Sequence, residues 1–366
     1  MKTKKVVVGM SGGVDSSVAA YLLKEAGYDV IGVTMQIWQD ESREIREENG
    51  GCCGLSAVDD ARRVAHSIGI PYYVMNFKSE FKSRVIDYFV DEYLKGRTPN
   101  PCIACNRYVK WESLLDRSLA IGADYIATGH YARIEELKNG RCALKVSKTA
   151  QKDQTYALYN LTQEQLRRTL MPVGDYTKEE IRKIAESISL RIAKKPDSQE
   201  ICFVPDRDYA GFIEGESGKS FETGNFIDGE GKVLGRHKGI GHYTIGQRKG
   251  LGIALGRPVF VKEIRPDTRE VLLAEDRELY ADTLIADRVN WMSIEGIDRS
   301  EGIFARAKIR YSHRGENCRI RDIGGGKIRV EFVNKVRAIT PGQAVVFYDE
   351  EEYVMGGATI LEAIYS

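Results

Sequence analysis

The stretch Val6-Val7-Val8-Gly9-Met10-Ser11-Gly12-Gly13-Val14-Asp15-Ser16-Ser17 decides the fold of the N-terminal part of the chain. Its apolar, β-branched beginning predicts a short strand, and residues 17–24 have the pattern of a helix. A glycine-rich turn between a strand and a helix directs backbone N–H groups and the positive helix end at one point. Gly12 and Gly13 let a ligand approach the backbone closely, and the serines add hydroxyl donors. We therefore expect an anion site here, with phosphate as the anion.

The loop differs from two common phosphate-binding motifs. No Gly-Lys-Ser/Thr follows it, which excludes a Walker A loop, and its glycines do not have the GxGxxG spacing. It resembles instead the PP-loop of enzymes that split ATP into AMP and pyrophosphate and so adenylate an oxygen. Asp15 would repel a phosphate unless it caps the helix or holds Mg²⁺, and we expect both roles.

The composition bounds the class of protein. The chain has 366 residues, a formal net charge of +1 and seven cysteines, which is enough length for two or three domains of about 100–200 residues. No apolar run approaches a membrane span, and residues 1–5 lack a signal-peptide core, so we expect a cytoplasmic protein. The unevenly spaced cysteines do not indicate a disulfide framework.

Strand and helix patterns alternate from Lys5 to about Asp124, which predicts a parallel sheet covered on both faces, with ligands beyond the carboxyl ends of its strands. Strands are expected over residues 6–9, 29–35, 72–76 and 125–128. Residues 36–54 and 95–106 are expected to be loops. Thr177 and Glu180 predict a capping box for a helix over 178–186, and we place the end of this α/β domain at Asp208.

Beyond residue 208 short strand-like pieces alternate with glycine turns, which is typical of small β modules. A second β section begins near Thr283, with strands expected over 306–311 and 327–332 and a hairpin turn at Gly324-Gly325-Gly326. Basic residues outnumber acidic ones between Arg306 and Arg337. This excess fits either a solvated strand face or a surface that contacts an RNA backbone.

Two positions fall at the predicted ligand edge of the sheet. Met35 ends the second strand, where it would lie near an adenine, although a buried methionine is more often part of a core. The sequence Gly129-His130-Tyr131 follows the strand over 125–128, which places His130 at the same edge.

The cysteines carry the second strong signal. Cys102 and Cys105 form a CxxC pair beside Pro101, and Cys202 follows Asp197-Ser198-Gln199-Glu200-Ile201. Such a pair indicates a zinc half-site, a redox pair or iron–sulfur ligands, and the spacing alone does not choose. Zinc needs four ligands, and the extra candidates Cys52 and Cys53 are adjacent in a loop of their own. Cys142 and Cys318 lie in strand-like surroundings and are expected to be inert thiols.

Seven motifs together resemble those of the bacterial tRNA-specific 2-thiouridylase family, and they occur in that family's order over nearly the whole chain. They are residues 9–17, Thr98-Pro99-Asn100-Pro101, Cys105-Asn106, Ala127-Thr128-Gly129-His130-Tyr131-Ala132-Arg133, Lys152-Asp153-Gln154, Asp197 to Phe203, and Tyr243-Thr244-Ile245-Gly246-Gln247-Arg248.

The resemblance implies an architecture and a reaction. The fold would be an α/β PP-loop domain of the adenine nucleotide alpha-hydrolase type (residues 1–208), a central β domain (209–280) and a C-terminal β-barrel that contacts tRNA (281–366). The reaction would replace O2 of the wobble uridine, position 34 of tRNAs for Lys, Glu and Gln, by sulfur, with ATP consumed. The residues implied to bind ATP are Gly9, Met10, Ser11, Gly12, Gly13, Val14, Asp15, Ser16, Met35 and Gly129.

The cysteines receive roles from the same resemblance. Cys202 would carry a persulfide, and Cys105 would be the nucleophile that attacks it, leaving a Cys105–Cys202 disulfide and delivering sulfur to the activated carbon. A thiolate is a far better nucleophile near neutral pH than a hydroxyl. A cysteine desulfurase or a sulfur-relay protein would supply the sulfur.

Cys102 departs from the family pattern, because many members have Asp there, proposed as a general acid/base. A thiol is a poor substitute for a carboxylate, which puts that role in doubt. The alternative is a [4Fe–4S] cluster held by Cys102, Cys105 and Cys202, with the fourth iron open to bind hydrosulfide. Both routes give the same product and stay open at this point.

The resemblance also implies contacts with tRNA. Asn100, Pro101 and Cys102 would line the target base, and further contacts would come from His130, Lys152, Asp153, Gln154, Arg310, Tyr311 and Gln343. Flipping a base out of an anticodon loop costs little, since loop bases are unpaired.

Two other classes of protein share part of these features. A PP-loop ligase or amidotransferase has the same opening loop but needs an ammonia source, and no glutaminase domain is recognisable in the sequence. A non-catalytic RNA-binding protein that uses ATP as a switch would release neither AMP nor pyrophosphate.

Overall fold

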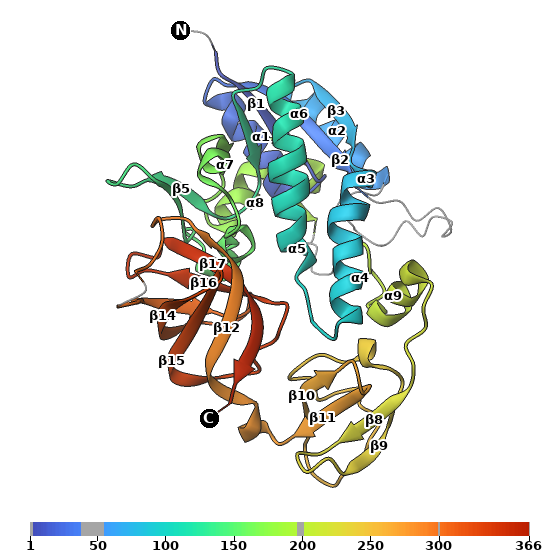
Figure 1. The fold of residues 1–366 in the computed structure, drawn as a ribbon. Helices are drawn as coiled ribbons and strands as arrows, with labels where there is room; N and C mark the ends of the chain where they lie inside the picture. Colours follow the sequence, from blue (N-terminus) through green and yellow to red (C-terminus); the bar gives the residue numbers. More distant parts are fainter. Residues whose placement is uncertain (1–2, 38–54, 196–200, 299–300, 366) are drawn as a thin grey trace. The chain divides into compact units, whose positions relative to one another are not determined.

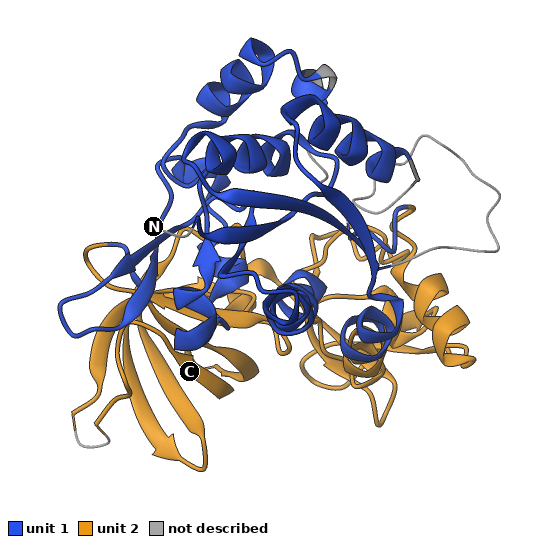
Figure 2. Cartoon of the chain, turned by 90° about the horizontal axis from the view of Figure 1, so that it is seen from above, with its two compact units in different colours: residues 1–86, 101–205, 352–354 blue, residues 87–100, 206–351, 355–366 orange. Residues whose placement is uncertain are grey.

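The computed structural model describes residues 3–37, 55–195, 201–298 and 301–365. The chain forms two compact units, coloured separately in Figure 2. Unit 1 comprises residues 1–86, 101–205 and 352–354, and unit 2 comprises residues 87–100, 206–351 and 355–366. This division does not test the predicted domain boundaries at residues 208 and 280, which stay predictions.

Unit 1 is built on a five-stranded parallel sheet with helices on both faces (Figure 2). The strand order is β3-β2-β1-β4-β7, and the strands are β1 (Lys5–Gly9), β2 (Asp29–Gln36), β3 (Tyr72–Asn76), β4 (Tyr125–Thr128) and β7 (Thr169–Leu170). The four strands predicted from the sequence are confirmed. Because all pairs are parallel, the carboxyl ends of β1, β2 and β4 lie at one edge of the sheet.

One face of this sheet is covered by α1 (Val14–Glu25), α2 (Leu55–Ile68) and α8 (Lys178–Ser187). Val6 and Val8 of β1 are fully buried in a core with Val18 of α1 and Ile181 of α8. The alternation of side chains along a strand explains why Val7, also fully buried, belongs to the other face. The capping box predicted at Thr177 and Glu180 is present, since each side chain bonds the other residue's backbone N–H.

A continuous helical segment runs from Pro101 to Ala120 as α5 (Pro101–Ala104), the π-helix η2 (Cys105–Leu114) and α6 (Leu115–Ala120) (Figure 1). The prediction of a loop over 95–106 is therefore wrong from residue 101 onward. Proline is favoured at the first position of a helix, where its missing N–H costs nothing. The CxxC pair accordingly lies on a helix rather than in a loop.

The remaining elements of unit 1 are short. They are α3 (Lys78–Phe81), the π-helix η1 (Lys82–Ile86), the hairpin β5 (Arg133–Glu136) and β6 (Cys142–Lys145), η3 (Ala150–Lys152), η4 (Thr155–Leu158), α7 (Gln163–Arg167) and η5 (Arg191–Lys194).

In the residues of unit 2 that the structure describes, the helices α4 and α9 accompany a small sheet and a closed barrel (Figure 1). The helices are α4 (Asp87–Leu94) and α9 (Tyr209–Ser217), with short turns η6 (Ile240–His242) and η7 (Asp276–Leu279). The four-stranded sheet has the order β10-β11-β8-β9, with β8 (Gly224–Ile227), β9 (Val233–His237), β10 (Phe260–Arg265) and β11 (Glu270–Ala274).

The barrel closes in the order β12-β15-β14-β13-β16-β17. Its strands are β12 (Tyr280–Trp291), β13 (Ile303–Lys308), β14 (Glu316–Gly324), β15 (Lys327–Arg337), β16 (Ala344–Tyr348) and β17 (Val354–Ile364). The two β modules and the hairpin at residues 324–326 are confirmed. The strand expected over 306–311 is displaced, because the chain turns where the His313 N–H donates to the Arg310 carbonyl at 3.0 Å.

In the parts of the chain that the structure describes, every helix falls short of the length and apolar character that crossing a membrane requires.

Candidate nucleotide and thiol site

The predicted anion loop joins β1 to α1 at the carboxyl edge of the sheet. Ser16 Oγ accepts a hydrogen bond from the Ser11 backbone N–H at 3.2 Å, and Ser17 Oγ donates to the Gly13 carbonyl at 2.8 Å. Gly13 is the N-cap residue of α1, and none of the described side chains caps the helix. The first N–H groups of α1 therefore have no partner within the helix, which is the arrangement that binds phosphate.

Two glycines let neighbouring segments approach this loop. Gly12 has a φ of +67°, and a Cβ atom there would lie 2.3 Å from the Ala57 carbonyl oxygen of α2. Gly129, just after β4, is so close to the loop that a Cβ atom would lie 2.5 Å from the Ser16 backbone nitrogen. Glycine is required at both positions, because the Cβ atom of any other residue would clash with the neighbouring backbone.

Asp15 does not cap α1, so that part of the prediction is wrong. It lies in the first turn of the helix, beyond the cap position. Both of its carboxylate oxygens lie 2.8 Å from Lys178 Nζ, and Oδ1 also accepts a hydrogen bond from the Tyr131 hydroxyl at 2.7 Å. The carboxylate is thus engaged by a cation and a hydroxyl in this structure.

A second lysine, Lys195, follows directly after η5 and contacts the loop. Lys195 Nζ donates to Asp60 Oδ2 of α2 at 2.9 Å and to the Gly12 carbonyl at 3.3 Å. Sequence reasoning missed both Lys178 and Lys195. The sequence did contain a hint for Lys178. A lysine at the first position of a helix is unfavourable, because the helix dipole is positive at that end.

The predicted adenine position lies at the end of β2. Met35 is half-buried and stands opposite Met75 of β3 in the sheet register. The neighbouring Thr34 donates to the Met10 carbonyl at 2.7 Å and accepts from the Tyr72 hydroxyl at 2.7 Å. These bonds fix the end of β2 against the phosphate loop, and contact of Met35 with adenine stays a prediction.

His130 follows β4 and is held in one neutral form. Its Nε2 lies 3.4 Å from Lys110 Nζ, and its Nδ1 lies 2.8 Å from Thr128 Oγ1. Because an ammonium only donates, Nε2 accepts and the ring proton is on Nδ1. Burial, and then the positive charge of Lys110, lower the pKa of His130 well below its usual value.

The three thiols of the predicted chemistry all belong to unit 1. Cys102 on α5 is exposed, while Cys105, the first residue of η2, and Cys202 are half-buried. The chain beside Cys202 is fixed by Phe203, whose ring packs edge-on against Phe81 of α3 at 5.6 Å between centroids. Asn106, next to Cys105, is buried and donates to the Ala157 carbonyl at 2.9 Å.

Cys142 on β6 and Cys318 on β14 lie in strands, as predicted, and are buried. Burial raises the pKa of Cys142, and it raises the pKa of Cys318 to about 12. Both are therefore protonated near neutral pH and poor nucleophiles. Cys52, Cys53 and residues 197–200 lie outside the described residues.

The predicted metal and cluster ligands do not converge. Among the described residues no group of three His, Cys, Asp or Glu side chains is placed to hold a metal ion. Cys102, Cys105 and Cys202 are all described, so in this conformation they do not fit a [4Fe–4S] cluster. The Asp15 carboxylate, engaged by Lys178, likewise does not fit a Mg²⁺ ligand as it stands.

The Lys152-Asp153-Gln154 motif is tied into unit 1 by its side chains. Asp153 is buried and accepts hydrogen bonds from the Ser147 N–H at 3.1 Å and the Thr155 hydroxyl at 2.5 Å. Gln154 exchanges hydrogen bonds with the Tyr131 backbone, both at 2.9 Å. Lys152 is half-buried. Contact of these three residues with tRNA stays a prediction.

The tRNA-facing positions predicted at the barrel lie in unit 2. Arg310 donates to the Arg337 carbonyl at 2.9 Å, and Tyr311 is 45% exposed in the loop after β13. Gln343 donates to the Thr98 carbonyl at 2.8 Å, which ties the segment leading to Asn100 to the loop before β16. Asn100 and Pro101 fall on either side of the division between the units.

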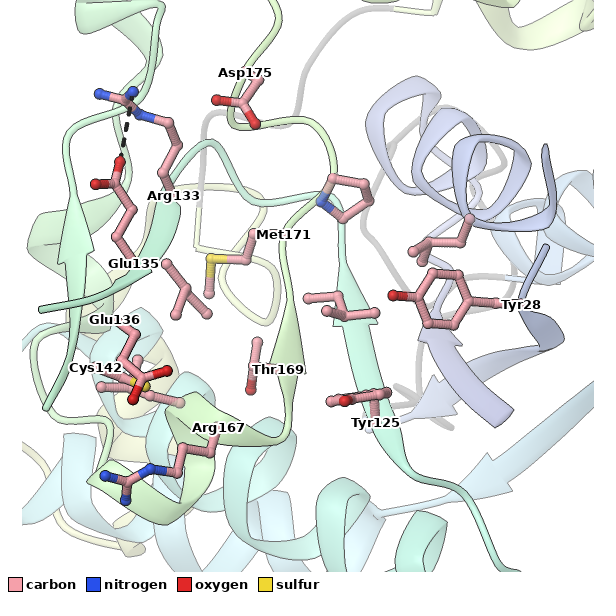
Figure 3. A pocket seen from close by; sticks show the side chains of 15 residues that line it. Tyr28, Tyr125, Arg133, Glu135, Glu136, Cys142, Arg167, Thr169, Met171 and Asp175 are labelled. Carbon is pink, nitrogen blue, oxygen red and sulfur yellow. Dashed lines mark ion pairs between the residues drawn. The ribbon is translucent and has the colours of Figure 1, made fainter. Parts of the chain in front are cut away.

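A separate pocket of about 480 Å³ is lined by residues of β4, β7 and the hairpin of β5 and β6, among others (Figure 3). Tyr28 and Tyr125 line one side of it, and Arg133 and Glu135 of β5 form an ion pair on the other. No residue predicted to bind ATP or sulfur lines it.

Comparisons with known proteins agree with this geometry. Family models match a tRNA methyl transferase HUP domain over residues 4–206, a tRNA methyl transferase PRC-barrel domain over 210–275 and an aminomethyltransferase beta-barrel domain over 281–360. The tRNA-specific 2-thiouridylase MnmA of Lachnoclostridium phytofermentans is 69% identical over 359 residues, which cover 98% of this chain and 100% of that relative. The MnmA of Clostridium perfringens is 58% identical over 365 residues, covering all of both chains.

A solved structure of the U34-tRNA thiolase NcsA from Methanococcus maripaludis with its [4Fe-4S] cluster is 21% identical and covers 59% of this chain and 68% of that one. Its TM-score of 0.34 is too low to bear on the site. The assignment rests on the full-length relatives. The chain belongs to the tRNA-specific 2-thiouridylase (MnmA) family.

Proposed function

We propose that the protein is an ATP-dependent tRNA uridine 2-sulfurtransferase, which replaces O2 of the wobble uridine by sulfur. The observation that carries this proposal is the match, over the whole chain, to relatives named tRNA-specific 2-thiouridylase. The geometry of unit 1 supports it, because a glycine-rich loop and the cysteines Cys102, Cys105 and Cys202 occur in one compact unit.

The loop after β1 serves the first half of the reaction. A uracil carbonyl oxygen is a very poor leaving group, so O2 attacks the α-phosphate of ATP, an O–P bond forms and pyrophosphate leaves. The unpaired N–H groups at the start of α1, with Gly12 and Gly13 beneath the phosphates, bind the pyrophosphate portion. Mg²⁺ accompanies the nucleotide, with its charge balanced by phosphate oxygens.

The thiols serve the second half. Cys202 carries a persulfide, and the Cys105 thiolate attacks its inner sulfur. A Cys105–Cys202 disulfide forms and hydrosulfide leaves; hydrosulfide adds to C2, and AMP departs with O2. An external thiol then reduces the disulfide, and a cysteine desulfurase or relay protein restores the persulfide. The two Cα atoms must come within about 4.4–6.8 Å for this step.

Contacts with tRNA are assigned to both units. Asn100, Pro101, Cys102 and His130 line the target base in this proposal, and Lys152, Asp153, Gln154, Arg310, Tyr311 and Gln343 contact the anticodon stem-loop. In this structure both ring nitrogens of His130 have protein partners, Lys110 and Thr128, so a hydrogen bond to the base would replace one of these contacts. The basic strands of the barrel contact backbone phosphates.

The experiment that tests the sulfur route is an assay of protein purified without oxygen, with its iron measured. Iron-free protein, supplied with undermodified tRNA, ATP, Mg²⁺ and a persulfide donor, should form 2-thiouridine at full rate. Activity that rises in proportion to bound iron would instead require the cluster route, and Cys102→Ser would then abolish it.

A further inference from the structure

The segment that leads to Asn100 has few backbone groups by which it can be held. Its sequence is Arg97-Thr98-Pro99-Asn100-Pro101, and a proline has no N–H and disfavours helix in the residue before it. Thr98 and Asn100 are therefore directed to extended conformations, and neither proline can donate to a strand ladder. The position of Asn100 depends on the bonds that this segment makes to other elements.

Thr98 is held at both of its backbone groups by the turn that precedes β16. Its N–H donates to the Pro341 carbonyl at 2.9 Å, and its carbonyl accepts from Gln343 Nε2 at 2.8 Å. Gly342 lies between these two partners with a φ of +90°, and a Cβ atom there would lie 3.0 Å from the Thr98 backbone nitrogen. The turn thus contacts the segment backbone to backbone, and the side chain of Gln343 makes one of the two bonds.

This turn is itself fixed to the barrel. The Gly342 N–H donates to the Ile360 carbonyl at 2.9 Å, and the Ile360 N–H donates to the Gln343 carbonyl at 2.8 Å. Ile360 is a fully buried residue of β17. The backbone of Gln343 is therefore held by a core strand, so its side chain reaches Thr98 from a fixed starting point.

The chain before Thr98 is anchored separately. The Arg97 N–H donates to the Glu92 carbonyl of α4 at 2.9 Å, and Arg97 Nε donates to Glu92 Oε2 at 2.7 Å. The Glu92 side chain is only 4% exposed. Gly96 packs so closely that a Cβ atom there would lie 2.7 Å from Pro266 Cγ. These contacts do not involve Gln343, so its loss should release Thr98 without unfolding α4.

From this geometry we propose that Gln343 is a positioning residue for the reaction, which holds the Thr98 carbonyl and thereby places Asn100 against the wobble uridine. The inference rests on the proposed function, in which Asn100 lines the target base and Gln343 contacts tRNA, and it gives Gln343 a second task. The two tasks use different atoms, because an amide donates through Nε2 and accepts through Oε1. Adenylation needs O2 of the uridine aligned with the α-phosphate, and a displacement of about 1 Å costs about 100-fold in rate.

The test compares the wild type with Gln343→Met, which keeps the length of the side chain and removes its hydrogen bonds. Undermodified tRNA is mixed with ATP, Mg²⁺, a persulfide donor and saturating protein, and the single-turnover rates of pyrophosphate release and 2-thiouridine formation should both fall about 10- to 100-fold. The affinity for tRNA should fall by no more than about tenfold, the scale of one hydrogen bond. Asn334→Leu is the matched control and should behave as wild type, because it removes an exposed amide of β15 that donates to Glu316.

Hydrogen exchange separates positioning from a general loss of structure. In a peptide that spans residues 97–101 the two prolines carry no amide hydrogen, so the signal reports chiefly on Thr98 and its neighbours. Exchange in this peptide should be faster in Gln343→Met, while exchange in β17 and the melting temperature stay as in wild type. Gln343→Lys keeps a donor for the Thr98 carbonyl and should recover most of the rate.

Two results would overturn the inference. One is a wild-type rate at saturating protein combined with weaker tRNA binding, which a residue that only contacts RNA would cause. The other is unchanged exchange in the peptide that contains Thr98. If Gln343→Met does not fold, Gln343→Asn is judged by the same two criteria, because its amide is one methylene too short to reach Thr98. Failure of the wild type to form 2-thiouridine would count against the proposed function, while exchange at Thr98 would still test the bond to Gln343.

Discussion

Gly129 lies so close to Ser16 that a Cβ atom on it would stand 2.5 Å from the Ser16 backbone nitrogen. The turn after β4 thus packs against the phosphate loop on one side. On another side α2 packs against the loop, because Gly12 has no side chain to prevent it. The nucleotide site is shaped by backbone proximity as much as by side chains.

Gly129→Ala should displace the first turn of α1. Because the neighbouring atoms are backbone, they cannot rotate away, and we expect a loss of about 1–3 kcal/mol in the free energy of unfolding and about tenfold or more in ATP affinity. Urea unfolding and calorimetry measure the two effects. Gly215→Ala is the control, since a Cβ atom there meets nothing within 4 Å. Wild-type ATP affinity in Gly129→Ala would contradict this account of the loop.

Cys105→Ser and Cys202→Ser should separate the two halves of the reaction. Each removes a thiol and leaves the phosphate loop intact, so 2-thiouridine formation should fall by at least about 10³-fold while pyrophosphate is still released when the tRNA is adenylated. Cys142→Ala should behave as wild type, because the Cys142 thiol is buried in β6. Retained thiolation in Cys202→Ser would remove this residue from the mechanism.

His130 should titrate well below the usual pKa of histidine, and Lys110→Met should raise its pKa toward the usual value without reaching it, since burial is the larger cause. NMR titration of the imidazole resonances measures both. Lys148→Met should leave the His130 titration unchanged.

The lowered pKa of His130 also makes the free energy of unfolding depend on pH. Between the lowered pKa of His130 and about 6.5 the unfolded chain binds the proton and the folded chain does not. The free energy of unfolding should therefore fall as the pH falls through this window, by about 1.4 kcal/mol per pH unit for one group. The fall should end at a higher pH in Lys110→Met, because the folded-state pKa of His130 is higher in that variant. A fall that extends to the same low pH as in wild type would refute the assignment to His130.

Tyr311 should contribute to tRNA binding through its exposed ring. Stacking on a nucleotide base is worth about 1–3 kcal/mol, so Tyr311→Ala should weaken tRNA binding by roughly 5- to 100-fold without lowering the melting temperature. Tyr311→Phe keeps the ring and should bind tRNA nearly as well as wild type. Equal binding by all three proteins in a filter assay would exclude this contact.

Patterns formed by residues that are close in sequence predicted those elements whose structure depends on such residues. The strand-turn-helix at residues 6–24 and the capping box at Thr177 and Glu180 depend on neighbours in the sequence, and both are present. The helix that begins at Pro101 was missed because two prolines and the CxxC pair were interpreted as loop residues, although proline also favours the first position of a helix.

Contacts between distant residues could not be predicted in this way. Lys178 is 163 positions from Asp15, and only the packing of α8 beside α1 brings them together. Lys195 meets Gly12 and Asp60 for the same reason. The sequence pattern predicts which loop binds an anion, whereas the charged side chains beside that loop come from elements placed by the tertiary fold.

Nucleoside mass spectrometry of the wobble position tests the central claim most directly. Undermodified tRNA for Lys, Glu or Gln is incubated with the protein, ATP, Mg²⁺ and a persulfide donor, and the digested nucleosides and released AMP are measured together. The account predicts 2-thiouridine at position 34 with an equal amount of AMP, and neither product without ATP. Release of AMP and pyrophosphate with the wobble uridine left unmodified would contradict it.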